Sequence, residues 1–261
     1  MSDLIAVIIL GIIEGVTEFL PVSSTGHLLL VENLGWLPRQ SDVFNTVVQC
    51  GAVIAVLAVF AKKVKEFAFE WQKPEVLDYL KKLFAAFFVT GVGGLILKKA
   101  GLRLPAEVAP VAWATLIGGI AILVIEHLLR GKKLKDEISW TVAILVGIAQ
   151  LVAGSFPGTS RSGATILLAL AFGVSRPRAT EFSFLLGIPT LFAAGALELF
   201  KARHELGSNN LMYLFVGTLA SAITAFIVVK WLLRFVQTHT FVFFGWYRIA
   251  LGLVILLFFC R

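Results

Sequence analysis

Two polar segments interrupt an otherwise apolar chain, and they limit its fold more than any other feature. The first runs from Glu14 to His27 and the second from Pro157 to Thr165, each with apolar residues on both sides. An ionised side chain in the middle of a bilayer costs about 2.5 to 3.5 kcal/mol on insertion scales, so such residues are normally kept for function. We therefore expect Glu14, Glu18 and Arg161 to belong to a functional site.

The rest of the chain has the composition of an integral membrane protein. Of its 261 residues 58% are hydrophobic and 15% are charged, and the mean hydropathy is +0.90, whereas a soluble domain has about 25% charged residues. Long continuous apolar runs, in place of short alternating segments, predict helices that cross ~30 Å of hydrocarbon. Six such spans are predicted, at about 42–61, 83–100, 109–130, 180–200, 211–233 and 241–260. The sequence thus predicts an all-α integral membrane protein.

Several other classes of function fit the sequence poorly. The net charge of +7 comes from basic residues spread through short loops, which is typical of membrane topology and not of a nucleic-acid surface. Cys50 and Cys260 lie far apart within predicted spans, so the sequence offers no disulfide framework and no cysteine metal site. We therefore expect the bilayer to be a partner and nucleic acid not to be one.

An internal duplication relates the two polar segments. An offset of 136 residues pairs Gly11 with Gly147, Pro21 with Pro157 and Ser24 with Ser160. After each proline the next helical stretch is at most ~20 Å long, too short to cross the bilayer, so each polar segment is predicted to form a re-entrant helical hairpin. The hairpins are expected at about 4–37 and 138–174. Within a single membrane domain, 1–261, we expect two repeats, 1–135 and 136–261, each a hairpin plus three transmembrane helices.

An odd number of crossings in each half makes the repeat inverted, so the two hairpin tips enter from opposite faces and meet near the midplane. The loops at 62–82 and 130–137 share one side of the membrane with two further pairs of basic residues, which gives fourteen basic residues against seven on the other side. The positive-inside rule places the richer side in the cytoplasm and both termini outside.

The first tip combines carboxylates, hydroxyls and an imidazole. Glu14 and Glu18 are four residues apart, so they share a helix face and could hold a divalent cation, Mg²⁺ or Ca²⁺, or position a water; a solvated helix face is the plainer alternative. Ser23, Ser24 and Thr25 are predicted N-caps of the next helix, whose free N–H groups bind phosphate, and Gly26 gives the backbone room. His27 is a candidate general acid or base.

The second tip repeats this design and adds a guanidinium. Arg161 could bind a phosphate or diphosphate through two parallel hydrogen bonds, and the neighbouring residues of the tip are predicted to contact the same anion: Thr159, Ser160, Ser162, Gly163 and Thr165. A structural ion pair with Glu14 or Glu18 is the alternative for Arg161, and the two interpretations are compatible. Together the tips favour phosphoryl chemistry on a substrate reached from within the membrane.

Two further polar residues in predicted spans are less specific. Glu181 could line the cavity or mark the membrane interface. Arg248, in the last span, could extend to the interface, bind a carboxylate or touch the substrate.

The stretches from Glu14 to His27 and from Pro157 to Thr165, followed by Glu181-Phe-Ser-Phe-Leu-Leu-Gly, closely resemble the bacterial undecaprenyl-diphosphate phosphatase family of the bacitracin-resistance type. The resemblance implies hydrolysis of undecaprenyl diphosphate to undecaprenyl phosphate and inorganic phosphate, which recycles the lipid carrier of peptidoglycan synthesis. It also implies the bacterial plasma membrane, a site facing the periplasmic or outer side, a divalent cation and often a homodimer.

By the same resemblance, Glu14 and Glu18 form the acidic pair, Ser24 and His27 are candidates for nucleophile and acid or base, and Arg161 holds the diphosphate. The sequence does not decide between Ser24 and His27 as nucleophile. A transporter or flippase for a lipid phosphate is the alternative function, because inverted repeats with broken helices are also typical of transporters.

Overall fold

The computed structural model describes residues 3–101, 107–203 and 208–259, and it is built from α-helices throughout these ranges. Cys260 and two of the seven basic residues on the less basic side, Arg103 and Arg261, lie outside the described residues. The helices, in chain order, are α1 (Asp3–Thr17), α2 (Ser24–Asn33), α3 (Asp42–Val59), α4 (Ala61–Phe69), α5 (Pro74–Lys99), α6 (Val108–Leu128), α7 (Trp140–Ser155), α8 (Arg161–Ala171), α9 (Arg176–Ala202), α10 (Ser208–Thr238) and α11 (Val242–Phe259).

Six of these helices are long and apolar enough to cross a membrane: α3, α5, α6, α9, α10 and α11. Each contains one of the predicted spans or nearly all of it, which confirms the all-α membrane protein. The predicted loop at 62–82 is wrong, because this stretch contains the short helix α4 and the first turns of α5. Pro74 begins α5, where its fixed φ suits the first helical turn and its missing N–H costs nothing.

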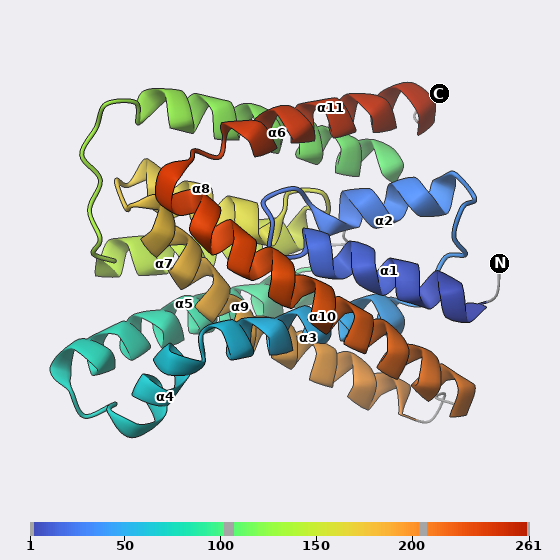
Figure 1. Ribbon diagram of the computed structural model, residues 1–261, viewed down its shortest axis with the longest axis horizontal. Coiled ribbons are helices and arrows are strands. Elements are labelled where there is room, and N and C mark those ends of the chain that lie inside the picture. The colour runs from blue at the N-terminus through green and yellow to red at the C-terminus, as the bar shows by residue number, and fades with distance from the viewer. Residues whose placement is uncertain (1–2, 102–106, 204–207, 260–261) are drawn as a thin grey trace.

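The two polar segments lie in helical hairpins. In the first, α1 ends at Thr17, four residues before Pro21, and α2 follows after a non-helical turn at 18–23. In the second, α7 ends at Ser155 and α8 begins at Arg161, so the turn occupies 156–160. In Figure 1 the α1–α2 hairpin enters the helical body from the end that carries both termini, and the α7–α8 hairpin enters from the opposite end.

The long helices hold the hairpins by packing across the two halves of the chain. Helix α1 packs against α10, α7 packs against α5, α3 contacts both α9 and α10, and α6 lies along α11. The closest approaches occur at glycines: a Cβ on Gly51 would meet the carbonyl of Thr218, and one on Gly147 would lie 2.6 Å from the carbonyl of Ala86. The backbone of α3 can therefore pack directly against α10, and that of α7 against α5. This close packing fixes where the two turns meet.

Candidate active site

The two turns have the same local conformation. Ser23 and Ser160 are the non-glycine residues with positive φ in the described chain, at 73° and 67°. Each caps the helix that follows: the Ser23 hydroxyl accepts from the Gly26 N–H at 3.3 Å, and the Ser160 hydroxyl accepts from the Gly163 N–H at 3.1 Å. Such a backbone conformation costs of order 1 to 3 kcal/mol and persists only where the surroundings enforce it.

This shared geometry corrects the pairing of the two tips. Ser160 corresponds to Ser23 and not to Ser24, one residue away from the pairing that the sequence offset gives. Arg161 therefore occupies the first helical position of α8, as Ser24 does in α2. The nucleophile candidate of one tip and the guanidinium of the other thus lie at matching positions, each at the start of a short helix.

The carboxylate of Glu18 joins the two turns. Its Oε1 accepts from Arg161 Nη2 at 2.9 Å, and its Oε2 accepts from the Ser24 hydroxyl at 3.0 Å. The ion pair is nearly enclosed, with the Arg161 side chain 12% exposed and that of Glu18 7% exposed. The structural ion pair considered for Arg161 is therefore present, and its partner is Glu18.

Neighbouring groups fix the direction of the Arg161 side chain. Nη1 donates to the Ser183 carbonyl at 3.3 Å, and the guanidinium carbon lies 5.0 Å from the centre of the Phe19 ring. Gly187 of α9 leaves the space that the guanidinium fills, because a Cβ there would collide with it. The Nε–H has no hydrogen-bond partner among the described residues. Arg161 thus reaches the junction of the two turns from a rigid support.

Glu14 differs from Glu18 in its surroundings. It lies one helical turn earlier on α1, is 1% exposed, and neither carboxylate oxygen has a hydrogen-bond partner within the described ranges. Glu18 and Ser24 are its polar neighbours. Two such oxygens fit the needs of a hard divalent cation, which takes carboxylate ligands. No group of three His, Cys, Asp or Glu side chains converges among the described residues, so a cation here would need further ligands from water or phosphate.

A cavity of about 810 Å³ opens beside this junction. Six of the residues predicted from the two tips line it: Glu18, Ser23, Ser24, Thr25, Ser160 and Arg161. The N-termini of α2 and α8 also face it, and the N–H groups in the first turn of a helix have no partner within the helix and carry its positive dipole end. A cavity with two helix N-termini and an arginine suits a diphosphate.

The sequence analysis missed most of the opposite wall. Helix α3 contributes Asp42, Asn45, Thr46 and Gln49, while α5, α7 and α9 contribute Thr90, Gln150 and Thr190 among others. The four α3 residues recur at helical spacing on one face of a predicted span, and this polar stripe was the signal that could have identified them. The amide of Gln150 donates to both threonine hydroxyls, at 3.2 and 2.9 Å, which ties three helices together at the cavity wall.

A comparison with known protein families shows the family of this chain. The family model described as bacitracin resistance protein BacA matches residues 7–254. The chain belongs to this family. Among its relatives, the protein of Xylella fastidiosa named undecaprenyl-diphosphatase is 50% identical over 260 residues, which cover 98% of each chain. Proteins of the same name from Xanthomonas campestris and Rhizobium etli are 48% identical, over 260 and 257 residues, with at least 96% of each chain covered.

Five of the predicted contact residues of this BacA family member do not line the cavity. The buried Ser162 hydroxyl donates to the carbonyls of Glu18 and Leu20, at 3.2 and 3.0 Å, and so fastens the first turn to the second. The buried Thr165 hydroxyl bonds to that of Ser183 at 2.6 Å. Three further predicted substrate contacts are absent from the residues that line the cavity: Gly26, Thr159 and Gly163. The direct contact of all these residues with substrate therefore stays a prediction.

His27 also lies away from the cavity. Its Nδ1 is 2.7 Å from the Ser23 carbonyl, to which it donates, and its Nε2 is hydrogen-bonded to the Tyr247 hydroxyl at 2.6 Å. The two rings stack, 5.6 Å apart and 8° from parallel. Glu181, for which the sequence left a place in the cavity or at the membrane interface open, accepts from the Tyr79 hydroxyl and from Arg178. It does not line the cavity.

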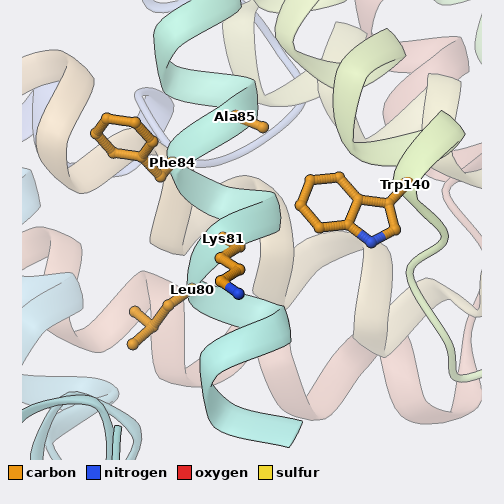
Figure 2. A pocket seen from close by; sticks show the side chains of 5 residues that line it. All are labelled: Leu80, Lys81, Phe84, Ala85 and Trp140. Atoms are coloured by element: carbon orange, nitrogen blue, oxygen red, sulfur yellow. The ribbon is translucent and has the colours of Figure 1, made fainter. Parts of the chain in front are cut away.

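A second, shallower depression of about 430 Å³ lies on the outer flank of the BacA fold. Figure 2 shows its lining, with Lys81 of α5 and Trp140 of α7 on either side of the gap between their helices. Trp and Lys at helix ends are typical of the boundary between bilayer and water. The depression lacks carboxylates and hydroxyls, so the cavity between the turns is the better candidate for chemistry.

Proposed function

We propose that this chain hydrolyses undecaprenyl diphosphate to undecaprenyl phosphate and inorganic phosphate, and so recycles the lipid carrier for peptidoglycan synthesis. One observation carries the proposal: Glu18 bridges Ser24 of one turn and Arg161 of the other, in a cavity faced by two helix N-termini. The names of the relatives support the substrate. The activity also accounts for the bacitracin resistance by which the family is described.

In this mechanism the diphosphate lies between the turns and Ser24 is the nucleophile. The Ser24 oxygen attacks the terminal phosphorus in line, the bridging P–O bond breaks, and undecaprenyl phosphate leaves. The serine proton passes to the Glu18 carboxylate, to which it is already hydrogen-bonded. Glu18 passes this proton to the departing undecaprenyl phosphate and becomes a carboxylate again. A water then attacks the phosphoserine and gives one proton to this carboxylate, the bond between phosphorus and the serine oxygen breaks, and Glu18 returns the proton to the serine oxygen as phosphate departs.

Arg161 and the helix N-termini stabilise the charge that moves onto the phosphate oxygens during both steps. Glu14 and Glu18 would hold the divalent cation, which when bound neutralises phosphate charge. The sequence analysis assigned the proton transfer to His27, but Glu18 is the group bonded to Ser24, so we assign it to Glu18. Attack by His27 through a phosphohistidine is the alternative, and locating the label after trapping with radioactive substrate distinguishes the two.

The membrane arrangement follows the same proposal. Each half, 1–135 and 136–261, would contribute one re-entrant hairpin and three crossing helices in an inverted repeat. Support comes from the matching turns, from the hairpins entering at opposite ends in Figure 1, and from both termini lying at one end. Asp42 and Lys98 line the cavity near the ends of their helices, on the side with fewer basic residues. We therefore infer a cavity open to the periplasmic side, both termini outside, and a homodimer as the family resemblance implies.

The purified chain in detergent is expected to release inorganic phosphate from undecaprenyl diphosphate, and EDTA is expected to abolish the release. Adding back Mg²⁺ or Ca²⁺ should restore it, because the carboxyl oxygens of Glu14 have no hydrogen-bond partner among the described residues and are of the type that binds such cations. Phosphate is measured colorimetrically over time. Full activity in EDTA would contradict the cation assignment alone. Transport of a lipid phosphate across vesicles without any hydrolysis would support the transporter or flippase in place of the enzyme.

A further inference from the structure

Arg248 of α11 makes an unusual set of contacts. Its side chain is completely buried, and its guanidinium makes five hydrogen bonds, which use every N–H donor that the group has. Nε donates to the Thr115 carbonyl at 3.1 Å, and Nη2 donates to the carbonyls of Ala114 and Gly158 at 3.1 and 3.0 Å. Nη1 donates to the carbonyls of Pro21 and Thr159 at 3.3 and 3.0 Å.

None of the three roles considered from the sequence matches this arrangement. The side chain does not extend to an interface, it has no carboxylate partner among the described residues, and it does not line the cavity. Its acceptors are backbone carbonyls of three separate segments: the first turn, the second turn and α6. The turn carbonyls lie outside the helices, so without Arg248 they would be buried acceptors that lack this partner.

These carbonyls adjoin the strained positions of the site. Pro21 lies two residues before Ser23, and Thr159 directly precedes Ser160. Ser23 and Ser160 have the positive φ angles that set the direction of α2 and α8, and so of Ser24 and Arg161. One guanidinium therefore restrains both strained turns at once. Because the group is planar and rigid, the directions of its N–H donors are fixed, and so are the positions of the carbonyls that accept from them.

We propose that Arg248 is a positioning residue, which locks the two turns together so that Ser24 and Arg161 face the same phosphate. This inference rests on the proposed hydrolase function. Two neighbours on α6 support it. A Cβ on Gly118 would collide with the guanidinium, so this glycine leaves its space, and the Thr115 hydroxyl lies 3.3 Å from the Gly158 carbonyl beside it.

The test compares Arg248→Lys and Gly118→Ala with Gly91→Ala. Lysine keeps the charge but has three donors on one nitrogen and cannot span both turns, whereas Gly118→Ala displaces the guanidinium and leaves every polar group present. Gly91→Ala is the matched control, since a Cβ there meets nothing within 4 Å. A misplacement of about 1 Å can cost a hundredfold in rate. We expect both test variants to lower kcat by about this factor with KM changed less than about threefold, and the control to match wild type.

Hydrogen exchange provides a second measurement that does not need activity. Amides of residues 18–26 and 156–163 are expected to exchange faster in both test variants, while those in the middle of α10 are unchanged. Wild-type kcat in Arg248→Lys and Gly118→Ala, or a loss confined to KM, would overturn the inference. If Arg248→Lys does not fold, Gly118→Ala decides. If the wild-type protein releases no phosphate, the proposed function fails, and unchanged exchange in the two turns then overturns this inference separately.

Discussion

Ser24→Ala is expected to lower the kcat of phosphate release by three orders of magnitude or more, on the scale of removing a nucleophile from a serine hydrolase. The variant removes a hydroxyl that is hydrogen-bonded to the Glu18 carboxylate and lines the cavity at the start of α2. Folding should be little affected, because Ser23 and not Ser24 caps the helix. Initial rates with undecaprenyl diphosphate at saturating concentration measure the effect.

Ser155→Ala is the matched control for Ser24→Ala. Ser155 also lines the cavity and is 8% exposed against 9% for Ser24, but its hydroxyl donates to the Leu151 carbonyl within its own helix. We expect this variant to keep a rate near that of wild type. Wild-type turnover by Ser24→Ala would exclude the serine mechanism, and the trapped label would then be sought on His27.

Arg161→Ala is expected to reduce kcat/KM by at least a hundredfold. It removes the cation that faces the phosphate, and it leaves the Glu18 carboxylate buried without its partner, which costs about 3 to 5 kcal/mol in comparable buried pairs. Arg161→Lys should recover only part of the loss, because an ammonium cannot bind Glu18, Ser183 and a phosphate in the directions that the guanidinium does.

Arg178→Ala serves as the control for loss of an arginine. The Arg178 side chain is 42% exposed and pairs with Glu181 three residues along α9, and exposed pairs contribute about 1 kcal/mol or less. Its activity should match that of wild type. Equal losses in Arg161→Ala and Arg178→Ala would indicate a general effect of charge on the protein and not a phosphate site.

The sequence predicted those parts of the structure that depend on the cost of polar groups in an apolar environment. The spans followed from long apolar runs, and an ion pair of Arg161 with Glu14 or Glu18 followed, as one of two compatible interpretations, from the cost of charges in a bilayer. Glu18 and Arg161 are far apart in the chain, yet the internal duplication was enough to bring them to one site.

The features that the sequence analysis missed depend on three-dimensional geometry. The pairing of the two turns is set by positive φ at Ser23 and Ser160, which shifts it by one residue from the alignment of identical residue types. Arg248 binds only carbonyls, and a backbone acceptor leaves no trace in sequence. The orientation of His27 depends on Tyr247, a residue of the last helix.

The central claim is that one hydrolytic site is formed by both turns, and a double-mutant cycle on Glu18 and Arg161 tests it most directly. Phosphate release from undecaprenyl diphosphate is measured for Glu18→Ala, Arg161→Ala and the double variant. Because the two residues act as one unit, each single change should lower kcat/KM by at least a hundredfold and the double variant should be no worse than the poorer single variant. Wild-type rates in either single variant, or losses that multiply in the double variant, would contradict the account.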